Sequence, residues 1–396
     1  MSTQDTSQFY IQLSSASFST ISFQSSLSDC QGANTIKRIC AGKSSIADYL
    51  VSEHGFKRIR LDRNSPTPPV EKSATNEHVP ESAPPRDGAA AVNQDGDANE
   101  PSFPNVNGLL EFVTKRWRER WVTTDIWDEA IVDALLRRPF FLLVSVDAPV
   151  SVRWERFKAR CIAASLPPPT LTDFVVRNDA HLFAAPTHLS SLLHRAQLRL
   201  LNATPSLSTL HEALRSLELA NPSRLRPSWD AYFMTLASLA AQRSNCMKRR
   251  VGCVLVSNNR VLSTGYNGTP RGMRNCNEGG CARCNAAAAG GSSLATCLCL
   301  HAEENALLEA GRERIKDGSI LYCDTCPCLT CSIKITQVGI TEVVYSLAYS
   351  MDTEAARIFD EGGVKLRQFV PPRDGLVDLA ALAGTEVDLA SLEIKP

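Results

Sequence analysis

One histidine and two cysteines in the second half of the chain have the types and spacing of metal ligands. His301 lies in CLHAEENALLEAG, and Cys328 and Cys331 lie in PCLTC, where a proline suits the first turn of a helix. Cysteines three apart fall on one helix face, and the positive end of the helix favours their thiolates. Together the three side chains would leave the fourth position of tetrahedral zinc for water.

A carboxylate next to the predicted ligand completes a hydrolytic site. Zinc with an open position lowers the pKa of its bound water to about 7, and a carboxylate must then move protons to the substrate. Glu303 follows His301 by two positions, so both can face one pocket only in the first turn of a helix. The alternative is a closed structural site, with Cys323 or Cys326 as a fourth ligand.

The composition argues against several kinds of partner. Lys and Arg total 42, as do Asp and Glu, so no overall field attracts a polynucleotide or a membrane. The apolar run at 140–144 is too short to span a bilayer, and the Ser-rich N-terminus shows no export or organelle signal. Of 14 cysteines, all except Cys30, Cys40 and Cys161 lie between Cys246 and Cys331. We therefore expect clustered metal-binding thiols in a cytoplasmic protein, also compatible with the nucleus.

Composition and hydrophobic periodicity divide the chain into segments. They predict a disordered tail at residues 1–34 and an α/β domain at residues 35–220, interrupted at 64–107 by a disordered insert rich in Pro, Ala and Asn. A Pro-containing joint then leads to a second domain at 226–370, and residues 371–396 form a C-terminal tail. In the second domain five short strands alternate with helices, which predicts a three-layer α/β/α sandwich.

The metal motif also carries a family resemblance. H-x-E followed by P-C-x-x-C is the zinc nucleobase-deaminase signature. The segments CMKRRVGCVLV at 246–256 and STGYNGTPRGMRNC at 263–276 are similar to those of deoxycytidylate (dCMP) deaminases, and the likeness covers roughly 227–370. It implies a cytidine-deaminase-like fold, zinc on His301, Cys328 and Cys331, and Glu303 as general acid and base. The implied reaction is hydrolysis of dCMP to dUMP and ammonia, which supplies dTMP synthesis.

The same resemblance suggests substrate contacts and partners. It implies that Asn267 contacts the sugar, with Tyr266 beside it, and that the protein is a homo-oligomer with dCTP and dTTP as effectors. A 5′-phosphate needs cationic donors such as Arg250; the candidates are Lys248, Arg249, Arg250, Arg271 and Arg274. Two alternatives stay open: a deaminase of tRNA adenosine or a free nucleoside, and a non-catalytic, zinc-stabilised nucleotide-binding protein.

The remaining thiols suggest a second zinc. They flank a long loop whose glycines and alanines offer little core, and they comprise Cys246, Cys276, Cys281, Cys284, Cys297 and Cys299. Some relatives carry a structural zinc in this region, and the positions that match them are Cys246, Cys276, Cys281 and Cys297, with Cys284 as a rival for the third ligand.

The first domain contains part of a phosphate-binding motif. Gly42, Lys43 and Ser44 fit the end of G-x-x-x-x-G-K-[ST], but Lys37 stands where the first glycine should be, and the preceding residues 29–38 are polar. The surrounding α/β pattern resembles nucleotide-monophosphate or dephospho-CoA kinases, as fused to fungal-type dCMP deaminases. We predict a degenerate P-loop kinase-like domain, a scaffold or a nucleotide sensor rather than a kinase.

Overall fold

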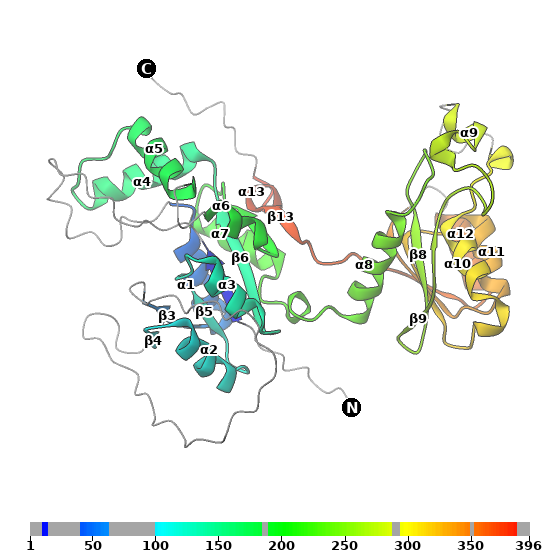
Figure 1. The fold of residues 1–396 in the computed structure, drawn as a ribbon, viewed down its shortest axis with the longest axis horizontal. Coiled ribbons are helices and arrows are strands. Elements are labelled where there is room, and N and C mark those ends of the chain that lie inside the picture. Colours follow the sequence, from blue (N-terminus) through cyan, green and yellow to red (C-terminus); the bar gives the residue numbers. More distant parts are fainter. Residues whose placement is uncertain are drawn as a thin grey trace, which may run out of the picture. The chain divides into compact units, whose positions relative to one another are not determined.

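The computed structural model describes residues 10–14, 40–62, 100–183, 189–286, 294–348 and 352–385 (Figure 1). The chain divides into two compact units. Unit 1 comprises the described residues up to Arg226 and those from Arg373 onward, and unit 2 spans Pro227–Pro372. The bounds of unit 2 therefore lie within two residues of those predicted for the second domain, 226–370.

Unit 1 is built on a six-stranded sheet in which every pair of neighbouring strands is parallel. The strand order is β13 (Gly375–Asp378), β7 (Leu198–Leu201), β6 (Phe141–Asp147), β1 (Tyr10–Ser14), β5 (Trp121–Thr123) and β2 (Lys57–Arg58). Parallel strands require crossover connections, and here helices supply them and cover both faces.

The helices of unit 1 form two layers around this sheet. One core joins the sheet to α1 (Lys43–His54), α7 (Leu207–Leu217) and α13 (Leu379–Leu382). The other joins it to α2 (Val106–Lys115), α3 (Glu129–Leu136) and α6 (Leu189–Arg195). Strand β6 serves both cores because its side chains alternate: Val144 packs in the first and Leu143 in the second. Helices α4 (Val150–Ala163) and α5 (Leu171–Phe183) share a smaller cluster, and η2 (Pro222–Arg224) precedes unit 2.

Both predicted tails contain strands of this sheet. The predicted tail 1–34 includes β1, which lies between β5 and β6, whereas residues 1–9 and 15–39 lie outside the described part. The predicted C-terminal tail 371–396 includes β13, which pairs with β7, and α13, whose first turn Asp378 caps. Val377 and Leu379 are buried in the first core. The tail predictions were therefore wrong for these residues, because pairing with distant strands outweighs a weak local pattern.

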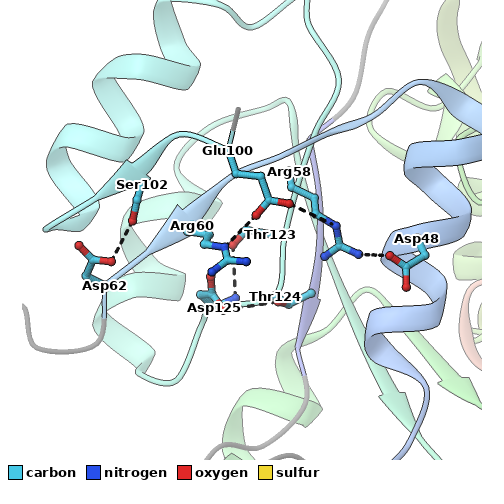
Figure 2. A network of polar contacts seen from close by, with 9 residues as sticks. All are labelled: Asp48, Arg58, Arg60, Asp62, Glu100, Ser102, Thr123, Thr124 and Asp125. Atoms are coloured by element: carbon cyan, nitrogen blue, oxygen red, sulfur yellow. Dashed lines mark hydrogen bonds and ion pairs between the residues drawn. The ribbon is translucent and has the colours of Figure 1, made fainter. Parts of the chain in front are cut away.

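The predicted insert 64–107 is also too long at its C-terminal end. Residues 63–99 lie outside the described part, but β4 (Ser102–Phe103) pairs in parallel with β3 (Arg60–Leu61), and α2 begins at Val106. Figure 2 shows Glu100 between Arg58 and Arg60, with its carboxylate 2.8 Å from Arg60 Nε and 3.7 Å from Arg58 Nε. Ion pairs and strand pairing thus join the two sides of the insert.

Unit 2 contains a mixed five-stranded sheet. Its order is β12 (Lys365–Gln368), β11 (Glu342–Leu347), β10 (Ile320–Thr325), β8 (Gly252–Ser257) and β9 (Arg260–Tyr266). Strands β10, β11 and β12 run parallel, whereas β8 is antiparallel to both β10 and β9. Short helices η3 (Cys276–Glu278), α9 (Ala282–Asn285) and η4 (Leu294–Thr296) follow β9, and η5 (Arg312–Arg314) precedes β10.

Helices cover both faces of this sheet, which gives the predicted α/β/α layers (Figure 1). Helix α8 (Trp229–Ala241) packs against Val254 and Val256 on one face. Helices α10 (Ala302–Ala310), α11 (Leu329–Gln337) and α12 (Asp352–Glu361) pack on the other, against Cys253 and Leu255. No helix within the described ranges has the length and apolar character required to cross a bilayer.

Gly265 determines how closely α10 approaches the sheet. A Cβ atom at this position would lie 2.0 Å from the Ala302 carbonyl oxygen and 2.6 Å from the Ala306 amide nitrogen. Any other residue would push the first turns of α10 away from β9.

A charged network joins three elements of unit 2. The Asp230 carboxylate on α8 accepts hydrogen bonds from Arg367 on β12, at 2.8 and 3.0 Å, and from the Tyr322 hydroxyl on β10, at 2.9 Å. Burial alone would raise the pKa of this carboxyl, but these hydrogen bonds outweigh burial and hold the pKa below its ordinary value.

Asp230→Asn should reduce the free energy of unfolding of unit 2 by about 1–2 kcal/mol at pH 7. The effect is modest because a partly exposed ion pair contributes less to stability than a buried one. The folded-state pKa is lowered, so this contribution is present at neutral pH and is lost as pH falls through that pKa. Hydrogen–deuterium exchange of the β10 amides measures the effect, with the exposed Asp317→Asn as control. Equal protection in the two variants at pH 7 would contradict it.

Candidate metal centre and active site

Three predicted ligands converge in unit 2. The Nδ1 atom of His301 lies 3.3 Å from the Sγ atom of Cys328 and 3.3 Å from that of Cys331. Together they form one of the groups able to hold a metal ion, with all ligand atoms within 4.8 Å of one another. Tetrahedral zinc, with bonds of about 2.0 Å to nitrogen and about 2.3 Å to sulfur, would separate these atoms by about 3.5 Å. The donor set therefore fits zinc.

Two helix N-termini position these ligands. His301 is the N-cap of α10 and Cys328 is the N-cap of α11, so both approach the site at the positive end of a helix. Cys331 lies one turn further along α11 and is fully buried. Neither Cys323 nor Cys326 belongs to the group of ligands within the described residues. The geometry leaves a coordination position open, which favours a catalytic site over a closed structural one.

The three predicted ligands differ in protonation. A hydrogen bond from Cys331, with a further one from His301, lowers the pKa of the Cys328 thiol to about 3. The thiolate of Cys328 in turn raises the pKa of His301 to about 9. The hydrogen bond to Cys328 also raises the pKa of the Cys331 thiol. Cys328 is therefore a thiolate at neutral pH, whereas a metal ion must displace protons from His301 and Cys331.

Glu303 lies in the first turn of α10, as the catalytic prediction requires. Its side chain is only 4 % exposed, and burial raises its pKa to about 7. A carboxyl group with a pKa near the working pH can both accept and donate a proton. Position and pKa together suit a general acid and base beside the metal.

Glu304, the next residue, holds the two ligand-bearing helices together. Its Oε2 atom accepts a hydrogen bond from the His301 backbone amide at 2.9 Å, which caps α10. Its Oε1 atom pairs with Lys334 on α11. The adjacent carboxylates therefore differ in surroundings, because Glu303 is buried and Glu304 pairs with the neighbouring helix.

Comparison with known proteins agrees with this geometry. Residues 227–347 match the cytidine and deoxycytidylate deaminase zinc-binding region. The deoxycytidylate deaminase of Schizosaccharomyces pombe is 48% identical over 345 residues, which cover 85% of this chain and 97% of that protein. The chain belongs to the deoxycytidylate deaminase family. Zinc is the cofactor of its deaminase domain.

Other relatives extend the comparison. The deoxycytidylate deaminase of Saccharomyces cerevisiae is 45% identical, over 67% of this chain and 86% of its own length. Among solved structures, the dCMP deaminase of cyanophage S-TIM5 in complex with dCMP and dUMP is 30% identical. That likeness covers 36% of this chain and 98% of the phage chain, with a TM-score of 0.31.

The residues predicted to contact substrate in this deaminase domain lie near the end of β9. Asn267 is 8 % exposed, and its amide holds the preceding segment: Oδ1 accepts from the Val251 amide at 2.8 Å, and Nδ2 donates to the Arg249 carbonyl at 2.7 Å. One amide hydrogen of Nδ2 stays available for a ligand. Tyr266, half-buried, ends β9, and Arg250 is exposed beside Val251. The contacts of these three with substrate stay predictions.

Two positioning residues were not foreseen from the sequence. Asn305 donates from Nδ2 to the Tyr266 carbonyl at 2.9 Å and so ties α10 to the end of β9. Ser244 donates to the Asn267 side chain, with 2.7 Å between the two oxygens. The position of Asn305, four residues after His301, could have indicated that both side chains lie on one face of the helix. Ser244 gave no such indication, because its partner Asn267 is 23 residues away in the sequence.

The remaining thiols gather in a second cluster, but in groups other than the predicted one. One group of potential ligands is Cys246, Cys276, Cys284 and Cys299, and the other is Cys281, Cys284, Cys297 and Cys299. The predicted set of Cys246, Cys276, Cys281 and Cys297 is not brought together as a single site. Cys284 belongs to both groups because its Sγ atom lies 3.9 Å from that of Cys246 and 3.8 Å from that of Cys297.

The partial P-loop of unit 1 begins α1. Gly42 has a left-handed backbone (φ of 100°), Lys43 occupies the first helical position, and Ser44 follows half-buried. Lys43 is only 3 % exposed, and its Nζ atom donates to the Thr124 carbonyl, just beyond β5, at 2.7 Å. A central strand, β1, does precede this motif, although residues 29–38 did not indicate one.

Replacing Cys331 with Ala should remove one zinc ion per chain, because two ligands hold zinc far more weakly than three. Cys323→Ala is the matched control, since Cys323 is equally buried in the same core but does not belong to the ligand group. Metal analysis of the purified proteins measures the difference. Loss of zinc from the control as well would indicate a closed site that includes Cys323.

Proposed function

We propose that this chain catalyses the hydrolytic deamination of dCMP to dUMP and ammonia, which supplies dUMP for dTMP synthesis. One observation supports the proposal: His301, Cys328 and Cys331 form a group of potential metal ligands, and buried Glu303 follows His301 in the first turn of α10, in a chain that matches a deoxycytidylate deaminase over 97% of that relative's length. Neither half of the observation would suffice alone, since three-ligand zinc sites serve many hydrolases.

Glu303 performs the proton transfers of the proposed mechanism. Zinc bound to the three ligands supplies a polarised water at neutral pH. Glu303 would take a proton from the attacking water and pass it to N3 of the cytosine ring as the bond at C4 forms. It would then take the second proton, from the new hydroxyl group on C4, and deliver it to the amine as the C4–N bond breaks and ammonia leaves. Its raised pKa of about 7 allows both directions of transfer. Its burial excludes bulk water as a competing proton donor.

Recognition of the nucleotide is proposed for residues around the end of β9. The free amide hydrogen of Asn267 would donate to the deoxyribose, with Tyr266 beside it. The exposed guanidinium of Arg250 would bind the 5′-phosphate, because its fork geometry matches phosphate oxygens. We also propose a cytoplasmic homo-oligomer with dCTP and dTTP as effectors, following the family resemblance.

For unit 1 we propose a degenerate P-loop kinase-like domain that senses a nucleotide. The all-parallel sheet, the left-handed Gly42 and the helix start at Lys43 support an anion site at the carboxyl ends of the strands. Lys37 in place of the first glycine argues against phosphoryl transfer. In addition, Lys43 Nζ is engaged with the Thr124 carbonyl, so a phosphate would have to compete for it.

Structural zinc is proposed for the thiols around α9. Their Sγ atoms are gathered into ligand groups, and the family resemblance implies a structural metal in this region.

The purified chain should release ammonia from dCMP much faster than from deoxycytidine or from tRNA. A chelator should abolish this activity, and added zinc should restore it. Faster turnover of tRNA or deoxycytidine would favour the alternative deaminases. Bound zinc with no turnover of any of these substrates would favour a non-catalytic nucleotide-binding protein.

Glu303→Gln should lower the dCMP turnover rate by about 10²- to 10⁴-fold, because the amide cannot accept and return a proton. Its zinc content should equal that of the unaltered chain, since Glu303 is not a ligand. Glu309→Gln, an exposed change on the same helix, is the control for loss of a negative charge. Turnover in Glu303→Gln near that of the control would refute the assigned role.

Lys43→Ala should weaken binding of ATP or dCTP to unit 1 by about tenfold or more, the effect of losing about 1.4 kcal/mol of charged hydrogen bonding. Calorimetric titration of the full chain measures it. Lys115→Ala, which removes an exposed lysine paired with Glu111, is the control. Failure of the unaltered chain to bind either nucleotide would leave unit 1 as a scaffold.

A further inference from the structure

A second group of potential metal ligands lies beside the catalytic centre and is made of thiols alone. The Sγ atoms come from three separate segments: Cys246 after α8, the turn of η3 and α9, and the residues before His301. Within the described residues they form a packed cluster without other apolar side chains, comprising Cys246, Cys276, Cys281, Cys284, Cys297 and Cys299. All six are free cysteines. Because the described core of this lobe consists of thiols, burial of large apolar side chains does not account for its order.

The spacing between these sulfur atoms matches the edges of thiolate tetrahedra around zinc. Cys284 Sγ lies 3.9 Å from that of Cys246, 3.8 Å from that of Cys297 and 4.0 Å from that of Cys299. Cys281 and Cys297 are separated by 4.0 Å. With zinc–sulfur bonds of about 2.3 Å, the sulfur atoms of a tetrahedral site are about 3.8 Å apart.

The cluster divides into two tetrahedra that share an edge. One comprises Cys246, Cys276, Cys284 and Cys299, and the other comprises Cys281, Cys284, Cys297 and Cys299. Only Cys284 and Cys299 belong to both groups. We propose that this lobe binds two zinc ions as a binuclear thiolate cluster, in which Cys284 and Cys299 bridge the ions and the other four cysteines are terminal ligands.

A single zinc ion would use the thiols less completely. An ion in the first group would leave Cys281 and Cys297 without metal, and an ion in the second would leave Cys246 and Cys276. Two tetrahedra that share one edge have six corners, which equals the number of thiols present. The position of Cys284, in contact with Cys246 of one group and Cys297 of the other, is what a bridging ligand requires.

Donors around the cluster suit its negative charge. The Met247 amide donates to Cys276 Sγ at 3.4 Å, and the Leu298 amide donates to Cys281 Sγ at 3.4 Å. The Arg283 guanidinium lies 3.8 Å from Cys297 Sγ. Two zinc ions and six thiolates carry a net charge of about −2, and such hydrogen bonds stabilise metal-bound thiolates.

The cluster would fix the chain on both sides of the catalytic pocket. Cys299 stands two residues before His301, and Leu300 between them forms a bridge with Gly268, next to Asn267. Cys246 begins the segment that the Asn267 amide holds at Val251. Binding energy of the ions would thus be used to order this lobe, as in small domains that fold around zinc.

The test is performed on the unaltered, zinc-loaded full chain. Metal analysis should give about three zinc ions per chain, one catalytic and two in the cluster. X-ray absorption should show zinc–zinc scattering, which only bridged ions produce. About two ions per chain without such scattering would overturn the proposal in favour of a single structural ion.

Variants then separate bridging from terminal ligands. In cadmium-substituted protein, ¹¹³Cd resonances of the cluster should be coupled to each other through the bridging sulfurs. Cys284→Ala should abolish this coupling, whereas Cys161→Ala, a buried thiol of unit 1, should leave metal content and coupling unchanged. Coupling that persists in Cys284→Ala would show that Cys284 does not bridge. If Cys284→Ala does not fold, the scattering measurement on the unaltered chain decides the question.

Discussion

The structure of the active site depends on the meeting of two helix N-termini at one point. His301 and Cys328 are both N-caps, and Cys331 follows one turn later, so the ligands approach from helices α10 and α11. Contacts elsewhere hold these helices in place. Gly265 allows α10 to lie directly on β9, and Glu304 joins α10 to Lys334 of α11. A shift of either helix by one ångström would separate ligands that must share one ion.

Burial separates the roles of two adjacent carboxylates. Glu303 is held inside the layer of α10 and the sheet, where burial raises its pKa to about 7. Glu304 has a lowered pKa, since the hydrogen bond from Lys334 outweighs its partial burial. One carboxyl group is thus suited to exchange protons and the other to remain charged as a structural link. The difference arises from which side of the helix each residue occupies.

Thiols and ion pairs stand in place of large apolar side chains in two regions of the described structure. The described part of the lobe around α9 packs as a cluster of cysteines. In unit 1, the two sides of the insert are joined by ion pairs to Glu100 as well as by a short strand pair (Figure 2). Each of these two regions adjoins a segment with few large apolar side chains. In such segments, strong directional bonds supply the order that burial of apolar surface supplies elsewhere.

The sequence by itself determined which three side chains form the ligand group, which carboxyl group follows it in the first turn of α10, and the layers of unit 2. Those signals are local: His301 and Glu303 share one helical turn, Cys328 and Cys331 share another, and strands and helices alternate with clear periods. Tertiary structure alone decided the rest, because it depends on contacts between distant segments. Neither β1 nor β13 carries enough apolar pattern to be recognised without its neighbouring strands. The grouping of Cys284 and Cys299 with thiols from three segments, and the engagement of Asn267 with the backbone at Val251, follow from how the chain returns to itself in space, which residue spacing along the sequence does not encode.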